Sequence, residues 1–147
     1  MLNDWLTSER IQIRTDITDW RQAVEVSAEP LLKEGTITPD YLTAIFAQRE
    51  KLGPYFVLAP GIAMPHARPE EGANGLGLSL LTLPQGVKFN SEDNDPVYTV
   101  VMLSAPDKHS HIELISELAE LFSSDEDMQK IHQAKSISEI QDVISRF

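Results

Sequence analysis

The chain contains no cysteine among its 147 residues. Without cysteine the protein has no disulfide framework, no thiol nucleophile and no thiolate metal site. Long hydrophobic runs are also missing, because no apolar segment approaches the ~18 residues that suggest a membrane-spanning helix. The first residues lack a basic region followed by an apolar run, so we expect no secretory signal and a cytoplasmic protein.

Basic residues are few in this chain. Lys and Arg number 12 against 23 Asp and Glu, which gives a formal net charge of −11. This charge opposes non-specific attraction to nucleic acid or to an anionic membrane, so we expect no nucleic-acid partner and no direct membrane insertion. The length and a hydrophobic content of 41% fit one globular domain over residues 1–147.

Common motifs of ligand binding are absent as well. There is no HExxH zinc motif and no P-loop. Gly75-Leu76-Gly77 is not a GxGxxG sequence, and it leads into a predicted strand rather than a helix. Nucleotide binding of the P-loop or dinucleotide kind is therefore excluded.

The hydrophobic pattern predicts strands mixed with helices. The order of these elements indicates a three-layer α/β/α fold, with a central mixed sheet of about five strands and helices on both faces. The expected strands are 10–14, 55–59, 76–83, 87–89 and 97–105. Two helices are expected to end near residues 34 and 53. Further helices are expected at 110–122, around 128–131 and at 136–146.

Local signals predict where these elements begin and end. Thr18 or Asp16 is expected to cap the first long helix, and Pro30 to kink it or loosen one turn. Residues 84–86, Pro-Gln-Gly, predict a turn. His132 lies on a short polar helix and is expected to face solvent. Capping pairs are expected for two later helices, Ser124 with Asp127 and Ser136 with Glu139.

Residues 60–69, Pro-Gly-Ile-Ala-Met-Pro-His-Ala-Arg-Pro, restrict the backbone around one histidine. Three prolines and a glycine flank His66, and they follow a predicted strand directly. Such restriction suggests that His66 is held in place for a purpose. The alternative is a rigid, proline-rich connection in which the histidine is incidental. Ile62 and Met64 belong either to a docking surface beside His66 or to the core.

Two histidines follow predicted strands, where sites in α/β sheets usually form. His66 comes after strand 55–59, and His111 starts the helix after strand 97–105. One interpretation is a metal site made by His66, His109 and His111. Another is phosphoryl transfer, because a neutral imidazole is a nucleophile, and Arg49 with a second histidine can neutralise phosphoryl charge.

Three separated motifs carry a family resemblance. Gly61-Ile62-Ala63-Met64-Pro65-His66 closely resembles the GIAxPH signature of enzyme IIA (EIIA) components of the mannitol/fructose class in the bacterial sugar phosphotransferase system. Arg49-Glu50 resembles the Arg-Glu pair of that family, and residues 110–119 resemble its second-histidine helix. The three matches occur in the family's order and extend over nearly the whole chain.

The resemblance implies a role for each matched residue. His66 would be the phosphorylated nucleophile, His111 would hydrogen-bond the phosphoryl group or orient the ring, and Arg49 would balance the phosphoryl charge. A phosphotransferase of this kind needs neither a cofactor nor a metal. Its donor would be the phosphocarrier protein HPr and its acceptor a cysteine of a cognate enzyme IIB, which serves a membrane enzyme IIC. The roles of Arg68 and His109 stay open.

The sequence around the motif most resembles the ascorbate-type branch of the family and its cryptic mannitol-like relatives. The resemblance is carried by residues 53–60, Gly-Pro-Tyr-Phe-Val-Leu-Ala-Pro, with support from 68–70 and 94–97. It implies uptake of a sugar such as ascorbate or a sugar alcohol. The alternative is a regulatory EIIA-like module that signals through protein contacts, and no signature in the chain separates the two roles.

Overall fold

A five-stranded mixed sheet lies at the centre of the molecule, as the sequence predicted. The computed structural model describes all residues 1–147. Across the sheet the strands are β1 (Ile11–Ile13), β4 (Gly77–Val87), β5 (Val97–Ser104), β3 (Ile62–Ala63) and β2 (Val57–Ala59). β1 is parallel to β4 and β3 to β5, whereas the pairs β4–β5 and β2–β3 are antiparallel.

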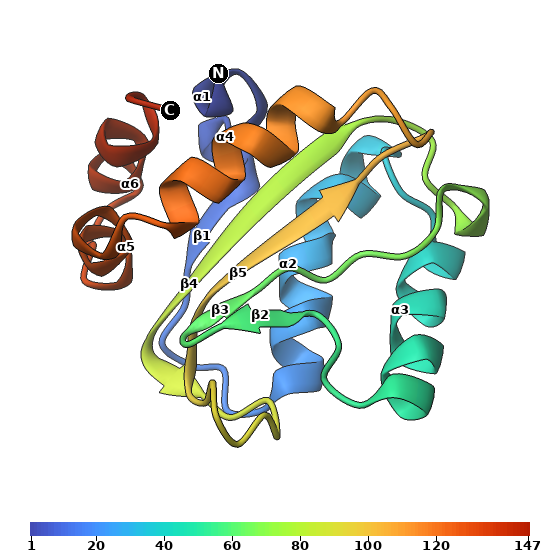
Figure 1. Ribbon diagram of the computed structural model, residues 1–147, viewed down its shortest axis with the longest axis horizontal. Helices are drawn as coiled ribbons and strands as arrows, with labels where there is room; N and C mark the ends of the chain where they lie inside the picture. The colour runs from blue at the N-terminus through green and yellow to red at the C-terminus, as the bar shows by residue number, and fades with distance from the viewer.

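Helices cover both faces of the sheet, which confirms the predicted three-layer α/β/α fold. Figure 1 shows α2 and α3 on one side and α1, α4, α5 and α6 on the other. The helices are α1 (Leu2–Trp5), α2 (Trp20–Glu34), α3 (Pro39–Leu52), α4 (Ile112–Phe122), α5 (Asp125–His132) and α6 (Ile137–Ile144), with 3₁₀ turns at Ser8–Arg10 and Pro69–Glu71.

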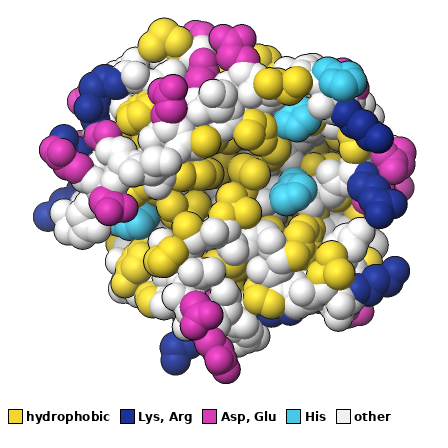
Figure 2. Space-filling model, viewed as in Figure 1, with side chains coloured by type: hydrophobic (Ala, Val, Ile, Leu, Met, Phe, Trp, Pro, Cys, Tyr) yellow, Lys and Arg dark blue, Asp and Glu magenta, His cyan; other side chains and the backbone are white.

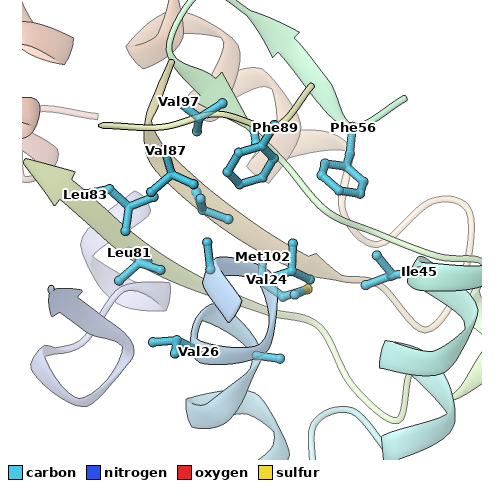
Figure 3. Close-up of a cluster of buried hydrophobic side chains, with 14 of the residues drawn as sticks. Val24, Val26, Ile45, Phe56, Leu81, Leu83, Val87, Phe89, Val97 and Met102 are labelled. Carbon is cyan, nitrogen blue, oxygen red and sulfur yellow. The ribbon is translucent and has the colours of Figure 1, made fainter. Parts of the chain in front are cut away.

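The sheet separates two hydrophobic cores. Successive side chains of a strand point to opposite faces, so Leu80 and its neighbour Leu81 on β4 enter different cores. Figure 3 shows the core under α2 and α3, in which Phe56, Phe89 and Met102 are fully buried. Because both faces of β4 and β5 are covered, their sequences read as nearly continuous apolar runs.

The turn predicted at residues 84–86 is wrong, and so is a separate strand at 87–89. β4 continues to Val87, which pairs with Val97 after an irregular stretch of the ladder. Pro84 has no N–H to donate, and such an irregularity is where a strand tolerates it. Gly86 takes φ +73°, a left-handed value that disfavours any side chain. Both turn-forming residues therefore lie within one long strand.

The cap of α2 is Asp19, not Asp16 or Thr18. Its carboxylate accepts the backbone N–H of Gln22 at 2.9 Å, because the residue directly before a helix reaches the free N–H groups of its first turn. The helix runs through Pro30 as one element. It ends at Glu34 as predicted, and the following Gly35 takes a left-handed φ of +77°. α3 begins at Pro39, where the missing N–H of proline costs no helical hydrogen bond.

β2 is shorter than the strand predicted at 55–59, and no pattern in the sequence predicts β3. These two strands form a hairpin around Pro60 and Gly61. Gly61 has φ +82°, and a Cβ there would lie 3.4 Å from the Tyr98 ring and 3.5 Å from His132. Glycine therefore permits both the turn and its close contact with the neighbouring side chains.

Ile62 belongs to the core, whereas Met64 is only partly buried. Ile62 is 4% exposed, and Met64 packs against the same hydrophobic cluster as Ile62. The two chain ends also lie side by side, with the Leu2 N–H 3.4 Å from the Phe147 carbonyl (Figure 1). No helix is both long and apolar enough to cross a membrane.

Candidate functional site

His66 and His111 line one cavity of about 320 Å³. β3 and β5 are parallel, so the segments that follow them leave the sheet at the same edge and meet there. Figure 2 shows histidine side chains gathered beside a hollow that has hydrophobic side chains at its floor and charged ones around its rim. The other lining residues are Tyr41, Ala67, Pro69, Leu103, Ala105, Asp107 and Lys108.

The His66 ring is held by a hydrogen bond to its own chain. Its Nδ1 lies 2.8 Å from the Met64 carbonyl oxygen. A carbonyl only accepts hydrogen bonds, so Nδ1 carries the proton and donates it. In the neutral ring Nε2 is then left with its lone pair, which is the state that a nucleophilic imidazole needs.

The backbone before His66 is fixed by the sheet. The Met64 N–H donates to the Phe56 carbonyl at 2.8 Å, and the Leu103 N–H donates to the Pro65 carbonyl at 3.2 Å. The expected restriction by prolines is thus supplemented by hydrogen bonds from both neighbouring segments. These contacts place the His66 segment beside the end of β5.

His111 reaches the cavity as the cap residue of α4. Its Nδ1 is buried and has no hydrogen-bond partner. The preceding turn is held by Asp107, whose carboxylate accepts the N–H groups of Ser110 at 2.6 Å and His109 at 2.8 Å. These backbone bonds lower the pKa of Asp107. The positive end of the α4 dipole therefore begins at the cavity, where it favours an anion.

Arg49 does not line this cavity. It lies in the last turn of α3, and its guanidinium donates to the Phe89 carbonyl at 3.2 Å. The same group lies over the Trp20 ring, 4.7 Å from its centroid, while its Nε is buried without a partner. Of the three predicted site residues, His66 and His111 line the cavity and Arg49 does not.

The only lining residue with a permanent positive charge is Lys108, which the motifs did not single out. Its position in the loop after strand 97–105, three residues before His111, is the signal that could have found it. His109 is exposed and does not line the cavity. Arg68 does not line it either, and its N–H donates to the Glu71 carboxylate at 3.0 Å.

A family comparison agrees with this arrangement of residues. The sequence model of the family described as "Phosphoenolpyruvate-dependent sugar phosphotransferase system, EIIA 2" matches residues 4–147. The chain belongs to this family. EIIA components are phosphotransferases that carry a phosphohistidine intermediate, so the activity predicted from the sequence is confirmed at the level of the family.

Individual relatives extend over nearly the whole EIIA chain. The ascorbate-specific PTS system EIIA component of Escherichia coli K12 is 37% identical over 147 residues, 99% of this chain and 96% of the relative. The solution structure of the mannitol-specific cryptic phosphotransferase enzyme IIA CmtB from E. coli is 39% identical with a TM-score of 0.90, covering 99% of both chains. The predicted resemblance to the ascorbate-type branch and its cryptic mannitol relatives is confirmed.

The structure of a third relative has been solved in complex with a partner protein. It is the enzyme IIA of the mannitol system in a complex with phosphorylated enzyme IIB, also from E. coli. This IIA is 25% identical with a TM-score of 0.82, and the match covers 96% of this chain and 97% of that one. The EIIA fold is therefore shared with a protein that binds a IIB component.

The metal-site interpretation has no geometric support in this EIIA chain. No group of three or more His, Cys, Asp or Glu side chains lies close enough together to hold a metal ion. His66 and His111 share a cavity that His109 does not line.

The prediction that His132 faces solvent is wrong. Its ring stacks on Tyr98 with centroids 5.2 Å apart, and its Nε2 is buried without a partner. This burial lowers the pKa of His132. The sequence did not reveal the contact because Tyr98 lies on β5, far away along the chain.

Proposed function

We propose that this EIIA chain carries a phosphoryl group on Nε2 of His66, which it accepts from phospho-HPr and passes to a cysteine of a cognate enzyme IIB. The observation that carries the proposal is the bond from Nδ1 of His66 to the Met64 carbonyl, which leaves Nε2 unprotonated beside the cavity shared with His111. Family membership supports the chemistry, and the mannitol IIA–IIB complex supports the acceptor.

The transfer exchanges one N–P bond for another. The Nε2 lone pair of His66 forms the new bond to phosphorus, while the donor ring of HPr keeps the electron pair of the bond that breaks. The proton on Nδ1 stays hydrogen-bonded to the Met64 carbonyl, which stabilises the positive charge that the ring gains. A cysteine thiolate of enzyme IIB then attacks the same phosphorus, and the His66 ring leaves with its lone pair restored.

Charge around the transferred group comes from several sources. His111, Lys108 and the positive end of α4 lie at the cavity and can donate to phosphoryl oxygens. Arg49 is retained as a charge-balancing residue on the strength of the family motif. To reach the phosphoryl group it would leave its contacts with Phe89 and Trp20.

We infer the wider context from the relatives. The name of the E. coli K12 relative favours ascorbate as the transported sugar, taken up by a membrane enzyme IIC that the IIB component serves. The proposed site of action is the cytoplasm, with residues 1–147 acting as one unit. A regulatory EIIA would use the same chemistry at His66, so transfer from this chain to a purified IIB is the step that separates the two roles.

Incubation with phosphoenolpyruvate, enzyme I and HPr tests the proposal. We expect wild-type protein to gain one acid-labile, alkali-stable phosphate and His66→Ala to gain none. His109→Ala is the matched control, because it removes an exposed histidine outside the cavity and should be phosphorylated normally. Normal phosphorylation of His66→Ala would show that the site is assigned to the wrong residue.

A further inference from the structure

Two tyrosine hydroxyls contact the backbone on either side of the His66 peptide. The Tyr55 hydroxyl donates to the His66 carbonyl at 2.6 Å. The Tyr41 hydroxyl accepts the Ala67 N–H at 3.0 Å and donates to the Leu103 carbonyl at 2.7 Å. The peptide group between the nucleophilic residue and the next one is therefore bound at both its oxygen and its nitrogen.

The tyrosine hydrogen bonds take the place of backbone hydrogen bonds in a segment without secondary structure. Residues 64–68 belong to no helix or strand, so their polar backbone groups have no regular partners. The sheet binds this segment only as far as Pro65, through the Leu103 N–H. Beyond that point the tyrosines hold it, and Tyr41 ties it to the end of β5.

The phenols stay neutral donors over the physiological pH range. Burial raises the pKa of Tyr55 to about 12. Burial also raises the pKa of Tyr41, which is 1% exposed. Neither bond is lost by ionisation under conditions in which the protein works.

Tyr55 also touches the ring that it positions. The rings of Tyr55 and His66 meet edge to face with centroids 5.7 Å apart. The Tyr55 ring thus limits how the imidazole can rotate, while the Tyr55 hydroxyl limits how the His66 backbone can move. In-line transfer depends on such control, because a small misplacement of a reacting atom slows the reaction strongly.

We propose that Tyr55 is a positioning residue for phosphoryl transfer: its hydroxyl fixes the His66 carbonyl, and with it the direction in which Nε2 meets the incoming phosphorus. Tyr41 supports the next residue in the same way. The inference rests on the proposed function of His66. It also gives a role to Tyr55, which the phosphoryl chemistry alone left without one.

The variant Tyr55→Phe tests this role because it removes one hydroxyl and keeps the ring. The control is Tyr98→Phe, which removes a hydroxyl from a tyrosine outside the His66 cavity. We expect Tyr55→Phe to lower kcat for phosphoryl acceptance roughly tenfold, with the KM for phospho-HPr changed less than about twofold. Loss of the Tyr55 hydroxyl frees the His66 backbone, and the bond from Nδ1 to the Met64 carbonyl forms only while that backbone keeps its position. In unphosphorylated protein, ¹⁵N NMR should therefore show His66 as the Nδ1–H tautomer in wild type and as a mixture in Tyr55→Phe.

The two measurements separate the possible failures. If Tyr55→Phe matches wild type in both kcat and the His66 tautomer signals, or merely melts at a lower temperature, Tyr55 has no positioning role. If wild-type protein accepts no phosphate at all, the proposed function fails, while the tautomer measurement still decides whether Tyr55 holds the ring. A Tyr98→Phe variant as slow as Tyr55→Phe would also overturn the inference, because the effect would not be specific to Tyr55.

Discussion

At the residue scale, the cation that lines the cavity of His66 is not the one that the motif suggests. The Arg-Glu pair pointed to Arg49, but its guanidinium is bound to the Phe89 carbonyl and lies over Trp20. Lys108 lines the cavity of His66 instead. A molecule with a net charge of −11 repels a phosphoryl dianion, so a cation at the cavity should matter for the rate.

Lys108→Gln should slow acceptance of phosphate from phospho-HPr by about three- to tenfold, because one charged donor is lost from a partly open site. Arg49→Ala should also slow transfer without unfolding the domain. The measurement is the initial rate of His66 phosphorylation at fixed ionic strength.

Lys130→Gln is the control, since Lys130 is an exposed lysine outside the cavity that pairs with Glu126. It should leave the rate unchanged. Normal kinetics in Lys108→Gln or in Arg49→Ala would remove that residue from the mechanism.

At the element scale, α5 supports the start of the His66 segment from the other side of the β2–β3 hairpin. His132, at the end of α5, stacks on Tyr98 and lies against Gly61. The backbone of Gly61 is bound in turn to β5, whose Tyr98 and Thr99 N–H groups donate to its carbonyl. The packing of α5 therefore supports the turn at Gly61, from which the His66 segment begins.

The stability of the protein should depend on the charge of His132. Burial lowers its folded-state pKa below the ordinary 6.5. The unfolded chain therefore binds the proton more readily than the folded protein does. The contribution of neutral His132 to the free energy of unfolding is fully present above pH 6.5, and it is lost as pH falls from there toward the folded-state pKa. We expect His132→Phe, which keeps the stacked ring, to unfold with a flatter pH dependence than wild type in this window.

Chemical denaturation of both proteins at several pH values measures this difference. Asp95 and Asp125 line the cavities next to His132, and they remain in the variant. His109→Gln, at an exposed position, should keep the wild-type slope. Parallel curves for wild type and His132→Phe would contradict the prediction.

At the scale of the whole molecule, one sheet lies between two hydrophobic cores of similar size. The core under α2 and α3 contains 19 buried residues, and the core under the other four helices contains 17. β4 and β5 contribute side chains to both. The cavity of His66 lies at the edge of this sheet, so its geometry depends on both layers of helices.

Leu80→Ala and Leu81→Ala should each lower the free energy of unfolding by about 2–5 kcal/mol, because each removes a buried leucine side chain from one of the cores. Since the two residues share one strand, both variants should unfold in a single transition. Leu52→Ala, at a side chain that is 64% exposed, should change the stability by less than about 0.5 kcal/mol. Two separate transitions in denaturation curves would show that the cores unfold independently.

The sequence by itself determined the fold class, the family and the candidate nucleophile. Apolar runs on β4 and β5 and helical spacing on α4 are local patterns, so they predict layers and helices without any knowledge of contacts. The caps Ser124 and Ser136 were found for the same reason, since a capping side chain binds within its own turn. His66 stood out because its prolines are its sequence neighbours.

Only the tertiary structure decided which residues meet. The bulge-like path of β4 through Pro84, the pairing of β3 with β5 and the stacking of His132 all depend on partners distant in sequence. The same holds at the site, where the Tyr55 hydroxyl bonds to the His66 carbonyl and Lys108 lines the cavity of His66. A local pattern can mark a nucleophile, but the groups that orient it and balance its charge come from separate segments, which only the packed sheet brings to one edge.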